Sequence, residues 1–424
     1  MPAAAQQPTP AMSLPSLPDH ATTPKPLAPS QRRQVILILG ALFTVTPFSI
    51  DMYLPAYQQI AHALNCSNAQ ISLSLASYFV GMALGQLFYG PLLDHYGRKP
   101  PIYVGLGVYI LASLACVEAP SVQILVALRF LQALGGCVAQ VATVAMVRDF
   151  FPAADSARIF SMLLLILGVS PLLAPTFGSL IATSLGWPWV FFLLAAIAAV
   201  ILAITAVLLP VGYQADLTVV LRPKQIIATF ATIFAEPRFR TYALAGACSF
   251  SGLFVYVAGS PIIFMENFHV GARTYGVIFA ILSVGFIGGS NLNILVSRHV
   301  SSERIFATAL TGQLLIGLVF ACGAAQGWYG LVPTIALLFA LLACLGFTNP
   351  NATALALSPI NHNLGSASAL LGFLQVGISA TASAAVGLLD AHTVAPIIAV
   401  VTVMAAIGMA ILLLGQRRRA VAIS

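Results

Sequence analysis

The chain has 424 residues, of which 59% are hydrophobic and 7% are charged, and its mean hydropathy is +0.97. Because a soluble protein carries about 25% charged residues, this composition excludes a water-soluble globule and predicts a polytopic membrane protein, with room for twelve crossings of about 20 residues each. The net charge of +7 is explained by basic residues on one membrane face, so it does not indicate a nucleic-acid partner.

The order of polar and apolar segments predicts two similar halves. Residues 1–34 form a Pro-, Ala-, Ser- and Thr-rich tail that we expect to be disordered and cytoplasmic. Apolar runs at 35–210 and 241–415 predict two six-helix bundles, joined by a polar central cytoplasmic loop at 211–240. A basic cytoplasmic tail at 416–424 ends the chain. The predicted fold class is an all-α membrane protein with 12 transmembrane helices in two pseudo-symmetric six-helix bundles.

The distribution of basic residues tests this arrangement through the positive-inside rule. With the amino terminus in the cytoplasm, sixteen of the 18 Lys and Arg residues fall in cytoplasmic segments, while Arg273 lies outside and Arg129 lies within the membrane. An odd number of helices would put the basic carboxy terminus outside, so twelve is favoured over eleven. The predicted helices, in chain order, are 35–57, 69–93, 101–117, 121–147, 158–185, 188–209, 242–264, 275–296, 305–322, 329–357, 366–389 and 393–414.

A faint repeat relates the two halves. The second predicted helix carries Gly81 and Gly85, and the eighth carries Gly285 and Gly289 at the same spacing. Glycines at this spacing allow helices to approach closely, and such two-fold repeats are typical of transporters.

Two formal charges are predicted to lie deep in the membrane, Asp51 in the first helix and Arg129 in the fourth. An ionisable group at this depth is costly and is a functional candidate. A helix rise of about 1.5 Å per residue puts the two within roughly 6 Å in depth, so they can pair if their helices are adjacent. Asp51 is then either a proton carrier tuned by Arg129 or half of a static ion pair that fixes helix packing. Pro55 is expected to loosen the helix near the acid.

A charged turn, GPLLDHYGRKP at residues 90–100, separates the second and third predicted helices and must lie at a membrane face. Asp94 can accept hydrogen bonds from a helix amino terminus in the other half, and Arg98 can pair with Asp149. Either this network holds one state of the protein, or the turn is solvated and anchors the topology.

This turn resembles the signature loop between helices 2 and 3 of the major facilitator superfamily of secondary transporters, with Gly90, Asp94, Gly97 and Arg98 at its defining positions. In that family the network is thought to act as a conformational latch, which would include Asp149.

Other stretches resemble the Bcr/CflA subgroup of drug–proton antiporters, associated with bicyclomycin and chloramphenicol resistance. They are DMYLP at 51–55, LRFLQALGG at 128–136, NPNA at 349–352 and GSASALLG at 365–372. GVSPLLAPTFG in the fifth helix is loosely similar to the antiporter motif of drug exporters. Taken alone, such a stretch more often indicates a kinked, closely packed helix than a transport mechanism. Its matching residues are Gly168, Pro171, Pro175 and Gly178.

Polar and aromatic residues within the spans mark a possible substrate cavity, although some are expected to make plain hydrogen bonds between helices. They are Tyr53, Tyr57, Tyr78, Gln86, Tyr256, Asn291, Asn293, Asn349, Asn351 and Gln375. The resemblance implies that the substrate-binding residues are Tyr53, Gln132, Tyr256, Asn349 and Gln375.

The resemblance implies a multi-pass protein of a bacterial inner membrane, with both termini cytoplasmic. It implies a monomeric multidrug efflux antiporter that exports small neutral or lipophilic compounds, such as phenicols or bicyclomycin, by alternating access. Its partners would be a small-molecule drug, protons and the lipid bilayer. The sequence has no phosphate-binding loop and no histidine pair at metal-ligand spacing, so we expect a proton gradient as the energy source, with no cofactor, no metal and no enzyme activity.

Two alternatives remain. A proton-coupled nutrient uptake symporter would use the same fold, because a fold fixes neither direction nor substrate. It would favour dedicated polar contacts for a hydrophilic solute. A non-transporting membrane receptor or scaffold would show no solute flux and an inert Asp51.

Overall fold

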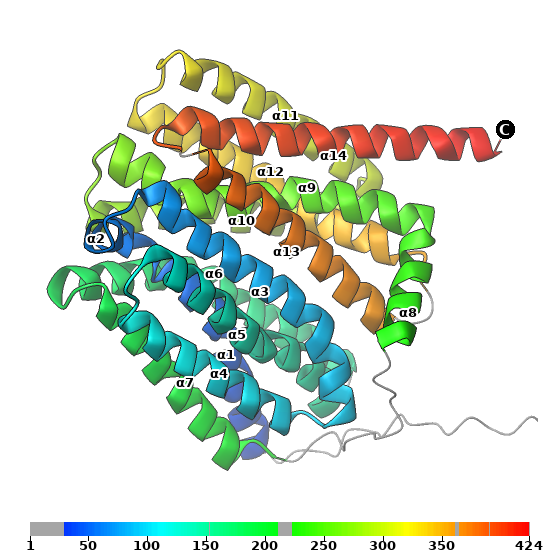
Figure 1. The fold of residues 1–424 in the computed structure, drawn as a ribbon. Helices are drawn as coiled ribbons and strands as arrows, with labels where there is room; N and C mark the ends of the chain where they lie inside the picture. The colour runs from blue at the N-terminus through cyan, green and yellow to red at the C-terminus, as the bar shows by residue number, and fades with distance from the viewer. Residues whose placement is uncertain (1–28, 152, 211–222, 361–363, 390, 424) are drawn as a thin grey trace, which may run out of the picture.

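The computed structural model describes residues 29–151, 153–210, 223–360, 364–389 and 391–423. Every regular element in those ranges is helical (Figure 1). Eleven helices there are long and apolar enough to cross a membrane, and α6 at Ala153–Ser184 is a twelfth helix of spanning length. This number agrees with the predicted twelve crossings.

The two halves of the chain form two groups of helices. The first comprises α1 Pro29–Asp51, η1 Leu54–Ala56, α2 Tyr57–Ala63, α3 Asn68–His95, α4 Lys99–Val117, α5 Val122–Phe150, α6 and α7 Pro188–Leu208. The second comprises α8 Pro223–Ala235, α9 Pro237–Pro261, η2 Ile262–Asn267, α10 Ala272–Val296, α11 Ser302–Ala325, α12 Leu331–Leu357, α13 Leu364–Leu388 and α14 Val394–Ile423. The groups meet where α3 runs along α13 and where α6 packs on α10 (Figure 1).

The glycine repeat marks equivalent helix contacts in the two groups. Gly85 brings α3 against α5, where an added Cβ would lie 2.8 Å from the Cβ of Cys137. Gly285 brings α10 against α12, where an added Cβ would lie 2.9 Å from the carbonyl oxygen of Phe339. The repeat seen in the sequence therefore corresponds to a repeat in packing.

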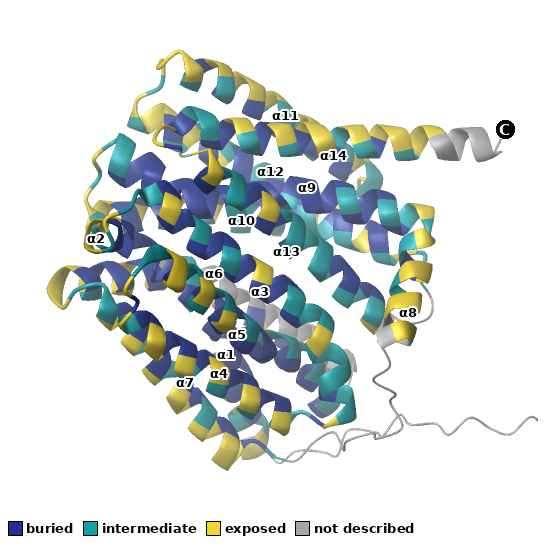
Figure 2. Ribbon diagram, in the orientation of Figure 1, coloured by how far each residue is buried: buried dark blue, intermediate teal, exposed yellow. Residues whose placement is uncertain are grey.

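Exposed residues lie along α4, α7, α11 and α14 (Figure 2), and many of them are large and apolar. Examples are Leu111, Val207, Val319 and Leu414. A water-facing surface rarely carries so much exposed apolar area, so these faces fit the hydrocarbon of a bilayer.

The first predicted helix, 35–57, is discontinuous. α1 ends at Asp51, and the short η1 with Pro55 at its centre leads into α2. Pro55 lacks a backbone N–H and cannot continue the α-helical hydrogen bonds, which agrees with the expected loosening beside the acid. The first long helix of the second half has a related irregularity, because α9 passes at Pro261 into the π-helical turn η2.

The predicted polar loop at 211–240 needs correction. Helix α8 and the start of α9 lie within it, while 211–222 lie outside the described residues. Phe230, Ile233 and Phe234 recur at helical spacing and pack on the core of the second half. The predicted tails differ as well: α1 begins at Pro29 and α14 continues to Ile423, while residues 1–28 lie outside the described part.

Candidate functional site

Asp51 is the last residue of α1 and is only 6% exposed. Among the described residues its carboxyl group has no hydrogen-bond or ion-pair partner. Burying a carboxyl without a partner is costly, above all when it is ionised. The end of α1 therefore carries a polar group that the fold itself does not satisfy.

The break after Asp51 lies where the two halves meet. The segment η1 packs against α6 of the first half and against α9 and α10 of the second. Gly178 of α6 lies directly on the backbone of Met52, leaving no space for a side chain. Tyr256 of α9 and Tyr275 of α10 are close enough to interact electrostatically with Asp51.

Arg129 in α5 is fully buried and occupies different surroundings. Its guanidinium donates to Gln132 Oε1 at 2.5 Å and to the carbonyl oxygen of Ser49 at 3.0 Å. It also lies over two aromatic rings, 4.3 Å from the centroid of Tyr78 and 4.6 Å from that of Tyr53. Such cation–π contacts stabilise a desolvated cation.

The expected pairing of Asp51 with Arg129 is not present in the structure. The helices α1 and α5 are adjacent, as the pairing required. Arg129, however, contacts the backbone of Ser49, and Asp51 lies two positions further along α1. Among the described residues the Asp51 carboxyl has no ion-pair partner, so the two charges are not paired in this conformation.

A polar network surrounds Arg129, although its Nε is buried and makes no hydrogen bond among the described residues. Gln132 donates to Ser113 Oγ at 2.7 Å, and Ser49 and Tyr109 share a hydrogen bond of 2.5 Å. Tyr53 and Gln132, both predicted to bind substrate, are fully buried in this region. The hydroxyl of Tyr53 is bonded to Ser74 Oγ at 2.7 Å. In this conformation both side chains make their hydrogen bonds inside the first half.

The predicted substrate residues of the second half lie in two places. Tyr256 is buried and stacks on Phe279 with ring centroids 5.7 Å apart. Gln375 of α13 donates to Asn349 Oδ1 of α12 at 3.2 Å, and both side chains are half-buried. The structure thus brings Asn349 and Gln375 together, while Tyr256 lies in α9, which packs against the segment η1 that follows Asp51.

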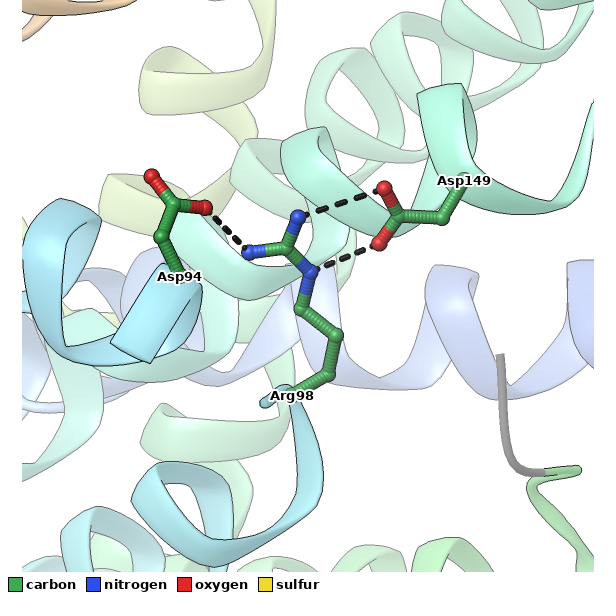
Figure 3. Close-up of polar contacts among 3 residues, drawn as sticks. All are labelled: Asp94, Arg98 and Asp149. Atoms are coloured by element: carbon green, nitrogen blue, oxygen red, sulfur yellow. Dashed lines mark hydrogen bonds and ion pairs between the residues drawn. The ribbon is translucent and has the colours of Figure 1, made fainter. Parts of the chain in front are cut away.

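The predicted turn at 90–100 is shorter than expected, because α3 continues to His95 and α4 begins at Lys99. The charged residues of this segment form a compact ion-pair network (Figure 3). Arg98 donates to Asp149 through Nε at 2.6 Å and Nη2 at 3.2 Å, and to Asp94 through Nη1 at 2.8 Å. Burial opposes the charge of Arg98, but hydrogen bonds and attraction from Asp149 and then Asp94 outweigh it and raise its pKa above the usual value. Gly97 has a φ of +79°, which favours glycine.

Two features of this turn differ from expectation. Asp94 pairs with Arg98, which lies four residues later in the same half, and not with a helix amino terminus of the other half. Gly90 has open space where a Cβ would sit, so close packing does not explain this glycine.

The fifth-helix motif lies inside α6, which contains Gly168, Pro171 and Pro175 and runs on to Ser184. Its structural effect is clearest at Gly178, which brings α6 onto the helix break beside Asp51. The motif therefore supports the candidate site through backbone packing.

Sequence reasoning missed a contact between the halves at the end of the molecule opposite Arg98. Asn68 of α3 donates to Glu266 Oε2 of η2 at 2.7 Å, and His392 Nδ1 lies 2.9 Å from Glu266 Oε1. The available signal was an acidic residue at the end of an otherwise apolar span. It also missed Tyr275, whose hydroxyl is bonded to Ser260 at 2.7 Å.

Comparison with known proteins agrees with this architecture. The sequence profile of the Major Facilitator Superfamily matches residues 38–384. A bicyclomycin resistance protein homolog of Haemophilus influenzae is 31% identical, covering 86% of this chain and 91% of its own. The multidrug resistance protein MdtL of Citrobacter koseri is 28% identical, covering 79% and 84%.

A solved structure is also similar. It is a bacterial homolog of the human lysosomal transporter Spinster in an inward-facing and occupied conformation. It superposes with a TM-score of 0.71 at 16% identity and covers 92% of this chain and 98% of its own. At that identity the likeness concerns the fold alone, and it confirms the predicted fold class.

Proposed function

Because the chain belongs to the Major Facilitator Superfamily of membrane transporters, we propose that it is a proton-driven efflux antiporter. Its substrates are small neutral or lipophilic compounds of the phenicol or bicyclomycin kind. The relatives named for bicyclomycin and multidrug resistance support this substrate class. The proposal includes a bacterial inner membrane, cytoplasmic termini and a monomer.

The observation that carries the proposal is the unpartnered carboxyl of Asp51 at the junction of the two halves. A carboxyl that only fixes packing needs a cation or hydrogen-bond donors around it. A buried carboxyl without either is held as the neutral acid and loses its proton once water or a donor reaches it. Such a group exchanges a proton whenever its surroundings alternate.

Alternating access supplies that change of surroundings. When one half rocks against the other around a midplane site, the contacts of η1 with α9 and α10 change, while those with Arg129 stay within the first half. Asp51 is thus the proton-exchanging group. Arg129 acts as a fixed charge that holds Tyr53 and Gln132 in place.

The latch role of Arg98, Asp94 and Asp149 belongs to the same proposal. The bidentate contact between Arg98 and Asp149 ties the loop after α3 to the end of α5, so the turn moves with the first half as one body. The side chains of Arg98 and Asp149 are only 10% and 13% exposed, and this burial supports the proposal.

The test is proton release from inside-out vesicles on addition of chloramphenicol, compared between the wild type and Asp51→Asn. Drug-dependent proton movement is expected in the wild type and lost in the variant. Asp51→Glu, which keeps an acid at the same position, is the matched control and should retain part of the flux. Undiminished flux in Asp51→Asn would reject Asp51 as the carrier.

The same vesicles distinguish the alternatives. Proton movement with a nutrient solute, in the direction of uptake and without response to any drug, would support the symporter. No flux with any solute, together with an Asp51→Asn variant that behaves like the wild type, would support a receptor or scaffold.

A further inference from the structure

Three segments from both halves of the chain gather at the end of the molecule opposite Arg98 (Figure 1). They are the start of α3, the π-helical turn η2 and the short turn between α13 and α14. Gly387, near the end of α13, lies directly on the start of α3, where an added Cβ would be 2.7 Å from the carbonyl oxygen of Ala69. The two halves are therefore tightly packed at this point, which we call the end junction.

The carboxylate of Glu266 in η2 contacts both halves at the end junction. Its Oε2 accepts a hydrogen bond from Asn68 Nδ2 at 2.7 Å, and its Oε1 lies 2.9 Å from Nδ1 of His392. Asn68 belongs to the first half, whereas Glu266 and His392 belong to the second. One carboxylate thus connects a contact between the halves to a titratable ring.

The backbone holds the partners of Glu266 in place on both sides. Asn68 is the first residue of α3, whose amino terminus is fixed by a capping box, and a helix amino terminus also favours a nearby negative charge. Beside His392, Ala391 is buried and its N–H donates to the carbonyl oxygen of Val386 at 3.2 Å. The carboxylate therefore lies between two fixed backbone segments.

The contact between His392 and Glu266 depends on where the ring carries its protons. An ionised carboxylate only accepts hydrogen bonds, so His392 Nδ1 must donate to it. A neutral imidazole carries one proton, and when that proton is on Nε2 the lone pair of Nδ1 faces the carboxylate. A protonated ring donates from both nitrogens and forms a charge-assisted hydrogen bond, about twice as strong as a neutral one. The contact is therefore strongest once the ring has bound a proton.

We propose that His392 and Glu266 form a proton-binding site, separate from Asp51, whose occupancy holds the two halves together at the end junction. The bound proton fixes Oε1 of Glu266 against His392, which leaves Oε2 directed at Asn68. This inference goes beyond the proposed function, because it requires neither a drug nor a proton gradient.

Two further observations support a switch over a permanent bond. The side chains of His392 and Glu266 are 51% and 28% exposed, so protons reach them from solvent. Asn68 Oδ1 is buried and has no hydrogen-bond partner among the described residues. A buried acceptor without a donor is unfavourable, so the closed end junction is incompletely satisfied and depends on the strength of the contact with Glu266.

The sign of the pH dependence follows from linkage. If the closed end junction binds a proton that the open one releases, closure is favoured as the pH falls and is lost as the pH rises. An imidazole titrates between about pH 5 and pH 8. The end junction should therefore open as the pH rises through that range.

Few other groups at this end can produce the same response. The turn η2 packs on α9, α10 and α14. The charged and titratable groups of these and the adjoining segments at this end are His62, Cys66, Tyr256, His269, Arg273 and Tyr275. Of these, the two histidines titrate in the same range as His392 and are exposed. In the sequence, Asp390 is two residues before His392, so it is tested as a rival partner.

The experiment measures the separation of the halves by double electron–electron resonance on the purified full-length protein, without drug. Spin labels are attached through Ala63→Cys at the end of α2 and Thr274→Cys at the start of α10, both at exposed positions. The native Cys66 and Cys322 are first changed to serine. Measurements are made at about pH 5.5 and about pH 8, toward the two ends of the imidazole range.

The open population of the wild type should rise at least about threefold from the lower to the higher pH. His392→Gln, which does not titrate, should show no such rise. His392→Lys keeps a cation at both pH values and should stay closed at both. Glu266→Gln should be as open at the lower pH as the wild type is at the higher pH.

The matched controls are the other ionisable groups. His62→Gln and His269→Gln should keep the pH response of the wild type, and so should Asp390→Asn. Loss of the response in Asp390→Asn, together with its retention in Glu266→Gln, would overturn Glu266 as the partner of His392.

The series is repeated with Asp51→Asn, because Asp51 is also expected to exchange protons. A response that persists there supports the separate site, and one that disappears overturns it. An open population independent of pH in the wild type, a response that survives in His392→Gln, or a His392→Lys protein that opens like the wild type overturns it as well. Absence of drug-dependent proton flux would refute the antiport alone, so the two failures can be told apart.

Discussion

Asp51 and Arg129 lie on neighbouring helices and differ in the interaction partners that surround their charged groups. The arginine has directed acceptors and two ring faces, whereas the acid has no partner among the described residues. A permanently charged side chain must be satisfied in every state, while an acid that gains and loses a proton must not be tied to a fixed cation. The different surroundings therefore agree with a fixed role for Arg129 and an exchanging role for Asp51.

Arg129→Lys tests the fixed role at the residue scale. A lysine has a single ammonium group and cannot reach Ser49 and Gln132 while lying over both rings. Losing one hydrogen bond to a buried charge costs about 1.5–3 kcal/mol, so we expect a lower melting temperature and reduced transport. Thermal melting and vesicle flux measure these effects. A lysine variant as stable and active as the wild type would show that charge alone is sufficient there.

At the scale of helices, the sequence predicted what depends on local pattern. Apolar run length defined the spans, and Pro55 predicted the irregularity near Asp51. Gly81, Gly85, Gly285 and Gly289 predicted close helix contacts but not the partner helices. The helix α8 was missed because its apolar spacing was outweighed by polar neighbours. The separation of Asp51 from Arg129 was missed because the sequence indicated only the depth of each residue in the membrane, and loop and span lengths carry no information about which way a side chain faces.

At the scale of helices, Gly178 gives the clearest prediction about the packing of α6 on the helix break. An added Cβ would overlap the backbone of Met52, so Gly178→Ala should push α6 away from the helix break. Overpacking of this kind costs about 1–3 kcal/mol, and transport should fall with stability because the break positions Asp51. Thermal melting of the variant and its drug-dependent proton flux are the measurements.

Gly90→Ala is the control for that experiment. Gly90 also lies inside a helix, but nothing occupies the space around its Cβ position. Alanine is favoured over glycine in a helix by about 0.5–1 kcal/mol, so this variant should melt at the same or a higher temperature. Equal destabilisation by both substitutions would contradict the packing argument at Gly178.

Over the whole molecule, the polar contacts of the described residues differ at the two ends of α3. The ion pairs of Arg98 with Asp94 and Asp149 join residues of the first half, whereas Asn68 and Glu266 join the two halves. Breaking a contact within one half changes the shape of that half. Breaking the contact between halves changes the balance between conformations, so the two ends should respond differently to substitution.

The native Cys66, two residues before Asn68, can report opening at that end. It is half-buried, and burial raises the pKa of its thiol above the usual value. A raised pKa leaves less thiolate at neutral pH, and the thiolate is the species that reacts. Maleimide labelling of Cys66 should therefore be slow at pH 7 and accelerate as the pH rises, and it should accelerate at fixed pH when the region opens to water.

Glu266→Gln should produce that acceleration. The substitution removes the carboxylate that accepts from Asn68 and that lies beside His392, so the halves separate more often at this end and the pKa of Cys66 returns toward its ordinary value. Labelling rates are compared in a Cys322→Ser background, because Cys322 is exposed. Glu303→Gln is the control, since Glu303 pairs with Arg238 within the second half at 2.7 Å and its loss should leave Cys66 unchanged. Equal rates in the Glu266 and Glu303 variants would show that the contact between Asn68 and Glu266 does not hold the two halves together.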